Sequence, residues 1–166
     1  MTVQSEHGSD DRIVVGVDGS SSSEAALRWA VTMADATGGR IVAITTWQVP
    51  LTYGWALMSG GWSPQKEAHQ LLDGAVHAVF GDDRPANVHL VVEEGNPAKV
   101  LIKHSAGARM LVVGRRGLGG FAGLLLGSVS SACAEHASCP VLVVHEPDKS
   151  EPHDESAPVT GEPQQD

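Results

Sequence analysis

The apolar residues of this chain fall into short runs separated by longer stretches with a different spacing. The first run, residues 13–17, is apolar apart from Gly16, as expected for a strand that is covered on both faces. Further short runs rich in β-branched residues predict four more strands, at 41–46, 88–92, 110–113 and 141–145.

Stretches with helical spacing lie between these runs. Ser21 and Glu24 have the spacing of a capping box, which predicts a helix from about Ser22 to the glycine pair at 38–39. The other predicted helices occupy 63–80, 96–102 and 127–137. Ser63-Pro64 and Asn96-Pro97 supply an N-cap followed by a proline at the first helical position. The last helix is expected to open on the hydroxyls of Ser128 and Ser130.

Alternating strands and helices predict an α/β fold, with a five-stranded parallel sheet and helices on both faces. Right-handed crossovers are compatible with the strand order 3-2-1-4-5. In that order the connections reverse direction between the first and fourth strands, and ligands of such sheets bind beyond the carboxyl ends of the strands at this point. Asp18 ends the first strand and Gly114 the fourth, so a nucleotide is expected between them.

The two ends of the chain differ in composition from its centre. Residues 1–11 are small, polar and charged, and 147–166 are rich in proline and acids, so both are expected to be disordered arms. The predicted domain is 12–146. Residues 47–63 hold three tryptophans and a tyrosine among Pro, Gly and Ser, and predict a long loop. It is either a lid or partner surface, or a cover for the sheet edge.

Composition narrows the classes of partner and compartment. The 166 residues are 42% hydrophobic and carry a formal charge of −9, which disfavours nucleic acid and anionic membranes. The N-terminus lacks the basic and apolar segments of a signal peptide, and no apolar run would span a bilayer. We therefore expect a cytoplasmic protein, with Cys133 and Cys139 reduced.

A glycine-rich segment, GRRGLGGFAGLLLGSVSS, follows the fourth strand. Glycines let backbone N–H groups approach phosphate oxygens, and the next helix adds free N–H groups and its positive dipole end. The hydroxyls of Ser128 and Ser130 suit phosphate or a divalent cation bound with it, and Arg115 and Arg116 add positive charge. The segment is neither a Walker A sequence nor a dinucleotide fingerprint, and its glycines alone are equally compatible with a flexible connector.

The spacing of the glycines carries a resemblance. Gly114, Gly117, Gly127 and Ser128 form a G-x2-G-x9-G-[ST] motif, which resembles that of the ATP-binding branch of the universal stress protein family. Three further segments are similar to that family: VGVDGS at 15–20, EGNPA at 94–98 and CPVLVV at 139–144. The resemblance covers residues 12–146.

The resemblance implies a Rossmann-like domain that binds ATP, with Mg²⁺ as an optional companion of the nucleotide. Gly114 would pass close to the ribose, and Thr46 would offer backbone groups to the adenine, although an ordinary strand-end threonine explains it equally well. The other implied roles are adenosine contacts from Val17 and Asp18, phosphate contacts from Gly117, Gly127, Ser128, Val129 and Ser130, and flanking contacts from Val113 and Arg116. Homodimers through Val141–Val144 are also implied.

Three classes of function remain open at this stage. The first is a nucleotide-responsive signalling or protective module. The second is slow ATP hydrolysis or adenylate transfer, and the third is a nucleotide-independent scaffold that uses residues 47–63. The cysteines and His136 form a C-x2-H-x2-C pattern without a fourth ligand nearby, so buried thiols are expected rather than a metal site. His69 and His77 are expected on a solvated helix face, in preference to a pH-sensing pair.

Overall fold

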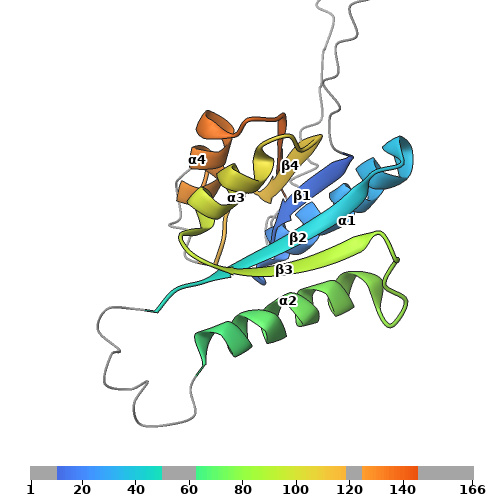
Figure 1. Ribbon diagram of the computed structural model, residues 1–166, viewed down its shortest axis with the longest axis horizontal. Coiled ribbons are helices and arrows are strands. Elements are labelled where there is room, and N and C mark those ends of the chain that lie inside the picture. Colours follow the sequence, from blue (N-terminus) through green and yellow to red (C-terminus); the bar gives the residue numbers. More distant parts are fainter. Residues whose placement is uncertain (1–10, 50–62, 119–124, 146–166) are drawn as a thin grey trace, which may run out of the picture.

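The computed structural model describes residues 11–49, 63–118 and 125–145. In this part of the chain, five parallel strands form one sheet with the order β3-β2-β1-β4-β5, and helices cover both of its faces (Figure 1). The predicted α/β class and strand order are thereby confirmed. The elements are β1 (Arg12–Gly16), α1 (Ser21–Thr37), β2 (Arg40–Trp47), α2 (Pro64–Phe80), β3 (Val88–Glu94), α3 (Pro97–Ser105), β4 (Met110–Gly114), α4 (Ser128–His136) and β5 (Val141–Val144).

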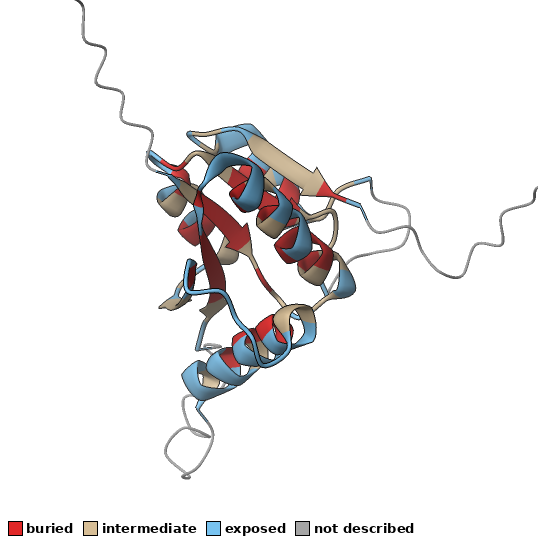
Figure 2. Ribbon diagram, turned by 90° about the vertical axis from the view of Figure 1, so that its right-hand side faces the viewer, coloured by how far each residue is buried: buried red, intermediate tan, exposed pale blue. Residues whose placement is uncertain are grey.

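The sheet is buried between two helical layers, α1 with α2 on one face and α3 with α4 on the other (Figure 1). Successive strand residues point to opposite faces, so Ile13 and Val15 pack toward α1 and α2 while Val14 packs toward α3 and α4. All three are fully buried, and Figure 2 shows the burial concentrated in the central strands and the inner sides of the helices. This arrangement explains why β5 and residues 13–15 of β1 and 110–113 of β4 are continuously apolar rather than alternating with polar residues.

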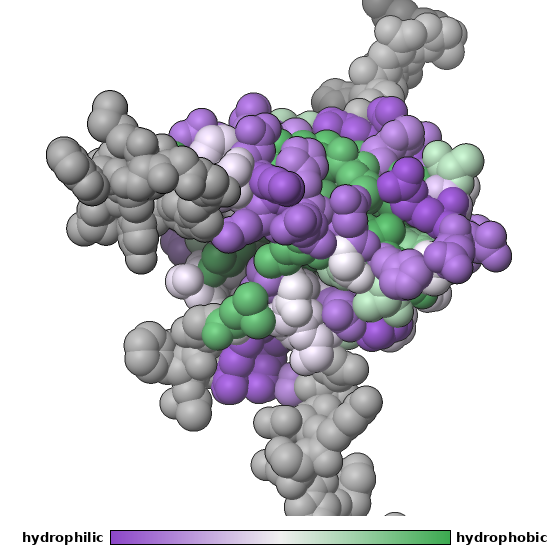
Figure 3. Space-filling view, turned by 90° about the horizontal axis from the view of Figure 1, so that it is seen from below, coloured by the Kyte–Doolittle hydropathy of each residue, from purple (hydrophilic) through white to green (hydrophobic). Residues whose placement is uncertain are grey.

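The outward side of α2 is polar. Figure 3 views the molecule from below, the side on which α2 lies in Figure 1, and its surface is mainly hydrophilic with apolar residues between. The exposed residues of α2 include Lys66, Glu67, His69, Gln70, Asp73 and His77. Both histidines are therefore solvated, as the sequence indicated. In the described residues, no helix is long and apolar enough to cross a membrane.

Helix ends with local signals lie where the sequence predicted them. Ser63 and Asn96 cap α2 and α3, and their side chains accept the N–H groups of Lys66 and Lys99 at 3.3 and 3.2 Å. Gly38 ends α1 in the left-handed conformation, with φ of 67°. These signals use residues at most four apart, so no distant segment can change them.

Two predicted caps are wrong. The N-cap of α1 is Ser20 rather than Ser21, and its Oγ accepts the N–H of Ser23 at 3.2 Å. The reason is that Ser20 is held at this position by Asp18, whose Oδ1 accepts its N–H at 3.1 Å. At α4 the N-cap is Gly127 with no side-chain cap, so the expected opening on serine hydroxyls is also wrong.

The ends of the predicted loop at 47–63 belong to regular structure. Trp47 is the last residue of β2, where it is paired with Glu94, and Ser63 is the N-cap of α2. The start of the loop was thus predicted one residue early, because strand pairing with β3 extends β2. The rest of it, 50–62, lies outside the described residues, as do 1–10 and 146–166, which hold the two predicted arms.

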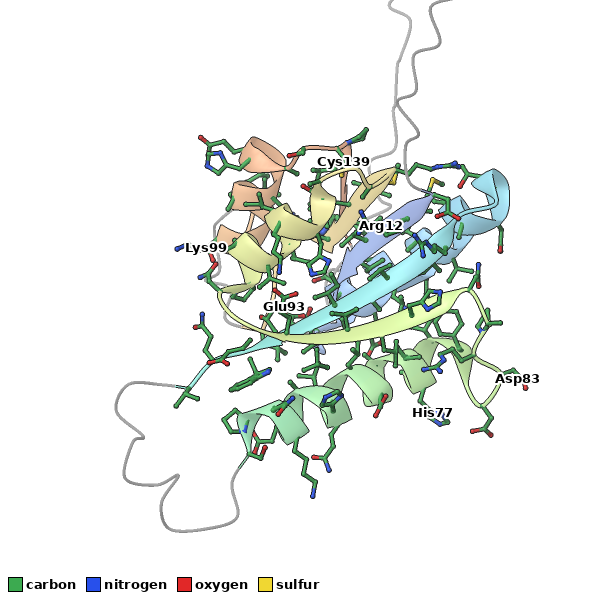
Figure 4. All side chains as sticks on the ribbon, viewed as in Figure 1. Arg12, His77, Asp83, Glu93, Lys99 and Cys139 are labelled. Atoms are coloured by element: carbon green, nitrogen blue, oxygen red, sulfur yellow. The ribbon has the colours of Figure 1, made fainter. Side chains whose placement is uncertain are left out.

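An ionic contact joins the edge strand β3 to α3. Glu93 Oε2 lies 2.7 Å from Nε2 of His104, and its Oε1 accepts a hydrogen bond from Nζ of Lys103 at 2.7 Å. Figure 4 shows Glu93 between β3 and α3. The hydrogen bonds from His104 and Lys103 lower the pKa of Glu93 below its ordinary value of 4.5.

A buried hydroxyl joins α3 to the segment before β5. Ser105 is fully buried, its Oγ donates to the carbonyl of Ile102 at 2.7 Å, and the same oxygen accepts the N–H of Ser138 at 2.9 Å. Because both hydrogen-bond partners of this buried hydroxyl lie in the protein, Ser105 joins α3 to the α4–β5 connection, where Ser138 itself is exposed.

We expect Ser105→Ala to lower the free energy of unfolding by about 1 kcal/mol, since the hydrogen bonds of its hydroxyl are lost. Chemical denaturation monitored by circular dichroism measures the change. Ser131→Ala is the matched control, because Ser131 is an exposed serine in α4. Equal stability of the two variants would contradict this role.

The Glu93 contact predicts a pH dependence. With a folded pKa below 4.5, Glu93 contributes stability above pH 4.5 and loses it as pH falls through the folded pKa. Glu93→Gln should therefore unfold more easily than the wild type at pH 7, by about 1 kcal/mol or less. The difference should shrink as the pH is lowered through the folded pKa of Glu93. Thermal melts across this range test it, with the exposed neighbour Glu94→Gln as control; a gap that widens on acidification would contradict it.

Candidate functional site

A cavity of about 680 Å³ opens at the carboxyl ends of the strands, where β1 and β4 lie side by side. All eleven residues that the sequence analysis selected line it: Val17, Asp18, Thr46, Val113, Gly114, Arg116, Gly117, Gly127, Ser128, Val129 and Ser130. They come from four separate segments, which meet because parallel strands bring their carboxyl ends to one edge. The volume is in the range usual for sites of small molecules and cofactors.

Part of the cavity wall is apolar. This apolar wall includes side chains from three elements, Ile44 on β2, Leu71 on α2 and Leu101 on α3. These residues belong to lining that sequence reasoning missed: Gly16, Ser23, Ile44, Thr45, Leu71, Pro97, Leu101 and Leu118. Helical and strand periodicity marked several of them as core, but it does not indicate which core residues border a cavity.

The backbone N–H and carbonyl of Thr46 point to the side of β2 that faces the cavity. The carbonyl of Ile44 accepts the N–H of Val17 at 2.9 Å, whereas the carbonyl of Trp47 accepts the N–H of Gly95 at 2.9 Å on the opposite side. Backbone groups of successive strand residues point to opposite neighbours, so those of Thr46 point to the side where β1 has already ended. A flat ligand placed there would meet one donor and one acceptor.

The N-terminus of α4 also lines the cavity. Gly127 caps this helix without a side-chain hydrogen bond, which leaves the N–H groups of Ser128, Val129 and Ser130 available at its first turn. These groups and the helix dipole favour an anion.

Two groups that the family resemblance assigned to phosphate are engaged within the protein. The N–H of Gly127 donates to the carbonyl of Arg115 at 2.8 Å, and the hydroxyl of Ser130 donates to the same oxygen at 2.8 Å. Gly127 has an ordinary φ of −73°, so it needs no left-handed conformation. The donors left for an anion are therefore the N–H groups of the first turn and the hydroxyl of Ser128.

Asp18 is also engaged within the protein. Its Oδ1 accepts hydrogen bonds from the N–H and Oγ of Ser20 at 3.1 and 2.6 Å, and its Oδ2 accepts the N–H of Leu118 at 3.1 Å. Both carboxylate oxygens thus hold backbone or hydroxyl donors from two loops. Asp18 and Arg116 are the only residues with a formal charge among the described ones that line the cavity.

The remaining candidate chemistry lies elsewhere. Cys133 is fully buried, as predicted, and burial raises the pKa of its thiol to about 11. Cys139 is only half-buried, so the prediction of two buried thiols is wrong for this residue, which lies just before β5. Partial burial still raises the pKa of Cys139, so neither thiol is activated as a nucleophile. Within the described ranges, no group of three or more His, Cys, Asp or Glu side chains is placed to hold a metal ion.

Comparison with known proteins extends over the whole described domain. A universal stress protein of Mycolicibacterium smegmatis is 37% identical over 146 residues, covering 85% of this chain and 48% of the relative. The chain spans about half the length of the curated relatives it matches.

Solved structures show the same fold. The universal stress protein UspA from Lactobacillus plantarum is 21% identical with a TM-score of 0.66, over 80% of this chain and 96% of that one. A universal stress protein solved in complex with cAMP is 29% identical with a TM-score of 0.52, over 81% of this chain and 95% of that one. The model of the universal stress protein family matches residues 11–145, and the chain therefore belongs to this family.

Proposed function

We propose that this chain binds an adenine nucleotide, with ATP as the first candidate, and acts as a nucleotide-responsive signalling or protective module. The observation that carries the proposal is that apolar side chains and the free N–H groups of a helix N-terminus line one cavity. A nucleotide has the same two parts, a flat base and an anionic phosphate chain. The relative solved with cAMP supports adenine nucleotides as the ligand class.

The described residues fit such a ligand. The apolar wall with Val17 and Val113 would enclose the base, and the backbone of Thr46 would meet its polar edge. Gly114 would lie at the ribose. The first turn of α4, with Gly117 and Arg116 nearby, would hold the phosphates, and Mg²⁺ would arrive bound to them.

Binding is favoured over ATP hydrolysis or adenylate transfer. Asp18 is the only carboxylate among the described residues that line the cavity, and both of its oxygens accept hydrogen bonds from the protein. A general base must accept a proton from the attacking water, and these three hydrogen bonds leave the carboxylate about one lone-pair site for it. We keep the cytoplasm as the expected compartment, where both thiols stay reduced.

Calorimetric titration with ATP, AMP, cAMP and adenosine tests the proposal. Saturable heat with at least one of the nucleotides is expected. A flat response to all of them would overturn the proposal and favour the scaffold that uses residues 47–63.

We also propose that the chain forms homodimers through β5. This strand lies at the edge of the sheet. Pro140 and Val144 direct their carbonyls to β4, where they accept the N–H groups of Leu111 and Arg115 at 2.9 and 2.7 Å. By alternation, the backbone groups of Val141 and Val143 point away from the sheet. A second copy would cover this edge and remove an aggregation hazard.

Ser128→Pro tests whether backbone N–H groups of α4 bind phosphate. Proline is tolerated at the first helical position, and the ψ of 162° at Gly127 suits a residue before proline. The variant should fold and lose about 1–3 kcal/mol of ATP binding. Ser128→Ala removes only the hydroxyl and should lose less. Equal ATP affinity of the two variants in calorimetry would contradict a contact to this N–H.

Val143→Pro tests the dimer. It removes an N–H that points outward while the bonds to β4 remain, and proline is tolerated in edge strands. The wild type and Val143→Ala should sediment as dimers at micromolar concentration, and Val143→Pro as a monomer. A wild-type monomer, or a proline variant that still dimerises, would exclude pairing through this edge.

A further inference from the structure

Two loops meet at the cavity through hydrogen bonds between residues about 100 positions apart. From the β1–α1 loop, Asp18 accepts the N–H of Leu118 at 3.1 Å. From the first turn of α1, the hydroxyl of Ser22 donates to the carbonyl of Arg116 in a short hydrogen bond. We call residues 114–118 the glycine loop. One backbone N–H and one backbone carbonyl of this loop are therefore hydrogen-bonded to the segment that contains Asp18 and Ser22.

Ser20 supports both contacts. Its hydroxyl has one proton, and the shortest acceptor is Asp18 Oδ1 at 2.6 Å. The Oγ of Ser20 also accepts the N–H of Ser23 and so caps α1. The N-terminus of α1 and the carboxylate are consequently fixed by one side chain.

Two glycines of the motif make this contact possible. A Cβ on Gly114 would lie 2.7 Å from the carbonyl carbon of Ser22, closer than real Cβ atoms approach backbone. A Cβ on Gly117 would overlap Oδ2 of Asp18. Gly127 differs, because its Cβ would have contacts of 3.4 Å or more. The first two glycines thus serve loop docking, in addition to any approach to a ligand.

The glycine loop also reaches α4. The carbonyl of Arg115 accepts the N–H of Gly127 and the hydroxyl of Ser130, each at 2.8 Å. The carbonyls of two consecutive residues are therefore hydrogen-bonded to helices on opposite faces of the sheet, that of Arg116 to α1 and that of Arg115 to α4. Displacing the first anchor would displace the N-terminus of α4.

We propose that Asp18, Ser20 and Ser22 form a latch that positions the glycine loop and the first turn of α4 for phosphate, so that Asp18 acts through the loop. The effect of the latch on phosphate binding rests on the proposed nucleotide binding, whereas the hydrogen bonds of the latch do not. Asp18 and Ser22 are positioning residues in this scheme. Their loss should weaken phosphate binding more than nucleoside binding.

The test combines affinity with amide exchange on the full chain. Asp18→Asn and Ser22→Ala should each weaken ATP binding by about tenfold or more, and leave adenosine binding within about twofold of the wild type. Ser22→Thr keeps the hydroxyl and should restore ATP affinity. Ser21→Ala, in the same turn but exposed, is the matched control and should change neither.

Hydrogen exchange of the Leu118 amide tests the latch without ligand. Leu118 is 73% exposed, so its amide should exchange freely unless Asp18 accepts it. Exchange in the wild type should be slower than in Asp18→Asn by about tenfold or more. Equal exchange overturns the latch even if ATP binds. If the wild type binds no nucleotide but Leu118 is protected, the proposed function fails and the latch stands. Equal losses of adenosine and ATP in Asp18→Asn would assign Asp18 to the nucleoside instead.

Discussion

The close approach of the β1–α1 loop to the glycine loop is the constraint on which the cavity depends. These loops leave adjacent parallel strands at the point where the connections diverge, α1 to one face of the sheet and α4 to the other. A side chain at Gly114 would separate them, because its Cβ would collide with the backbone of Ser22. With glycine there, both helix N-termini begin beside the same cavity.

Most polar groups around this point hold the protein together rather than wait for a ligand. Asp18 accepts a hydrogen bond from Ser20 in its own loop. The hydroxyls of Ser22 and Ser130 donate to backbone carbonyls of the glycine loop. The backbone N–H groups of the first turn of α4 remain for a ligand. A site whose supporting bonds already exist loses less entropy when a ligand binds.

Local and periodic signals were sufficient to predict much of the fold. The apolar runs predicted every strand within two residues, and Ser63, Asn96 and Gly38 marked three helix ends correctly. The eleven candidate site residues were selected mainly through the family resemblance, which rests on a glycine spacing, and they all line one cavity. Their individual roles toward a nucleotide stay predictions.

By itself, the sequence determined which segments are strands and helices, because periodicity and side-chain caps involve residues only a few positions apart. The glycine spacing behind the family resemblance also selected Gly114, Gly117 and Gly127, which line the cavity. Only the tertiary structure decided that Ser130 bonds Arg115, and that Leu71 and Leu101 line the same cavity. Asp18 and Leu118 are 100 residues apart, and no local pattern encodes the distance between their atoms. Such contacts exist only after the sheet has brought the two loops to the same edge.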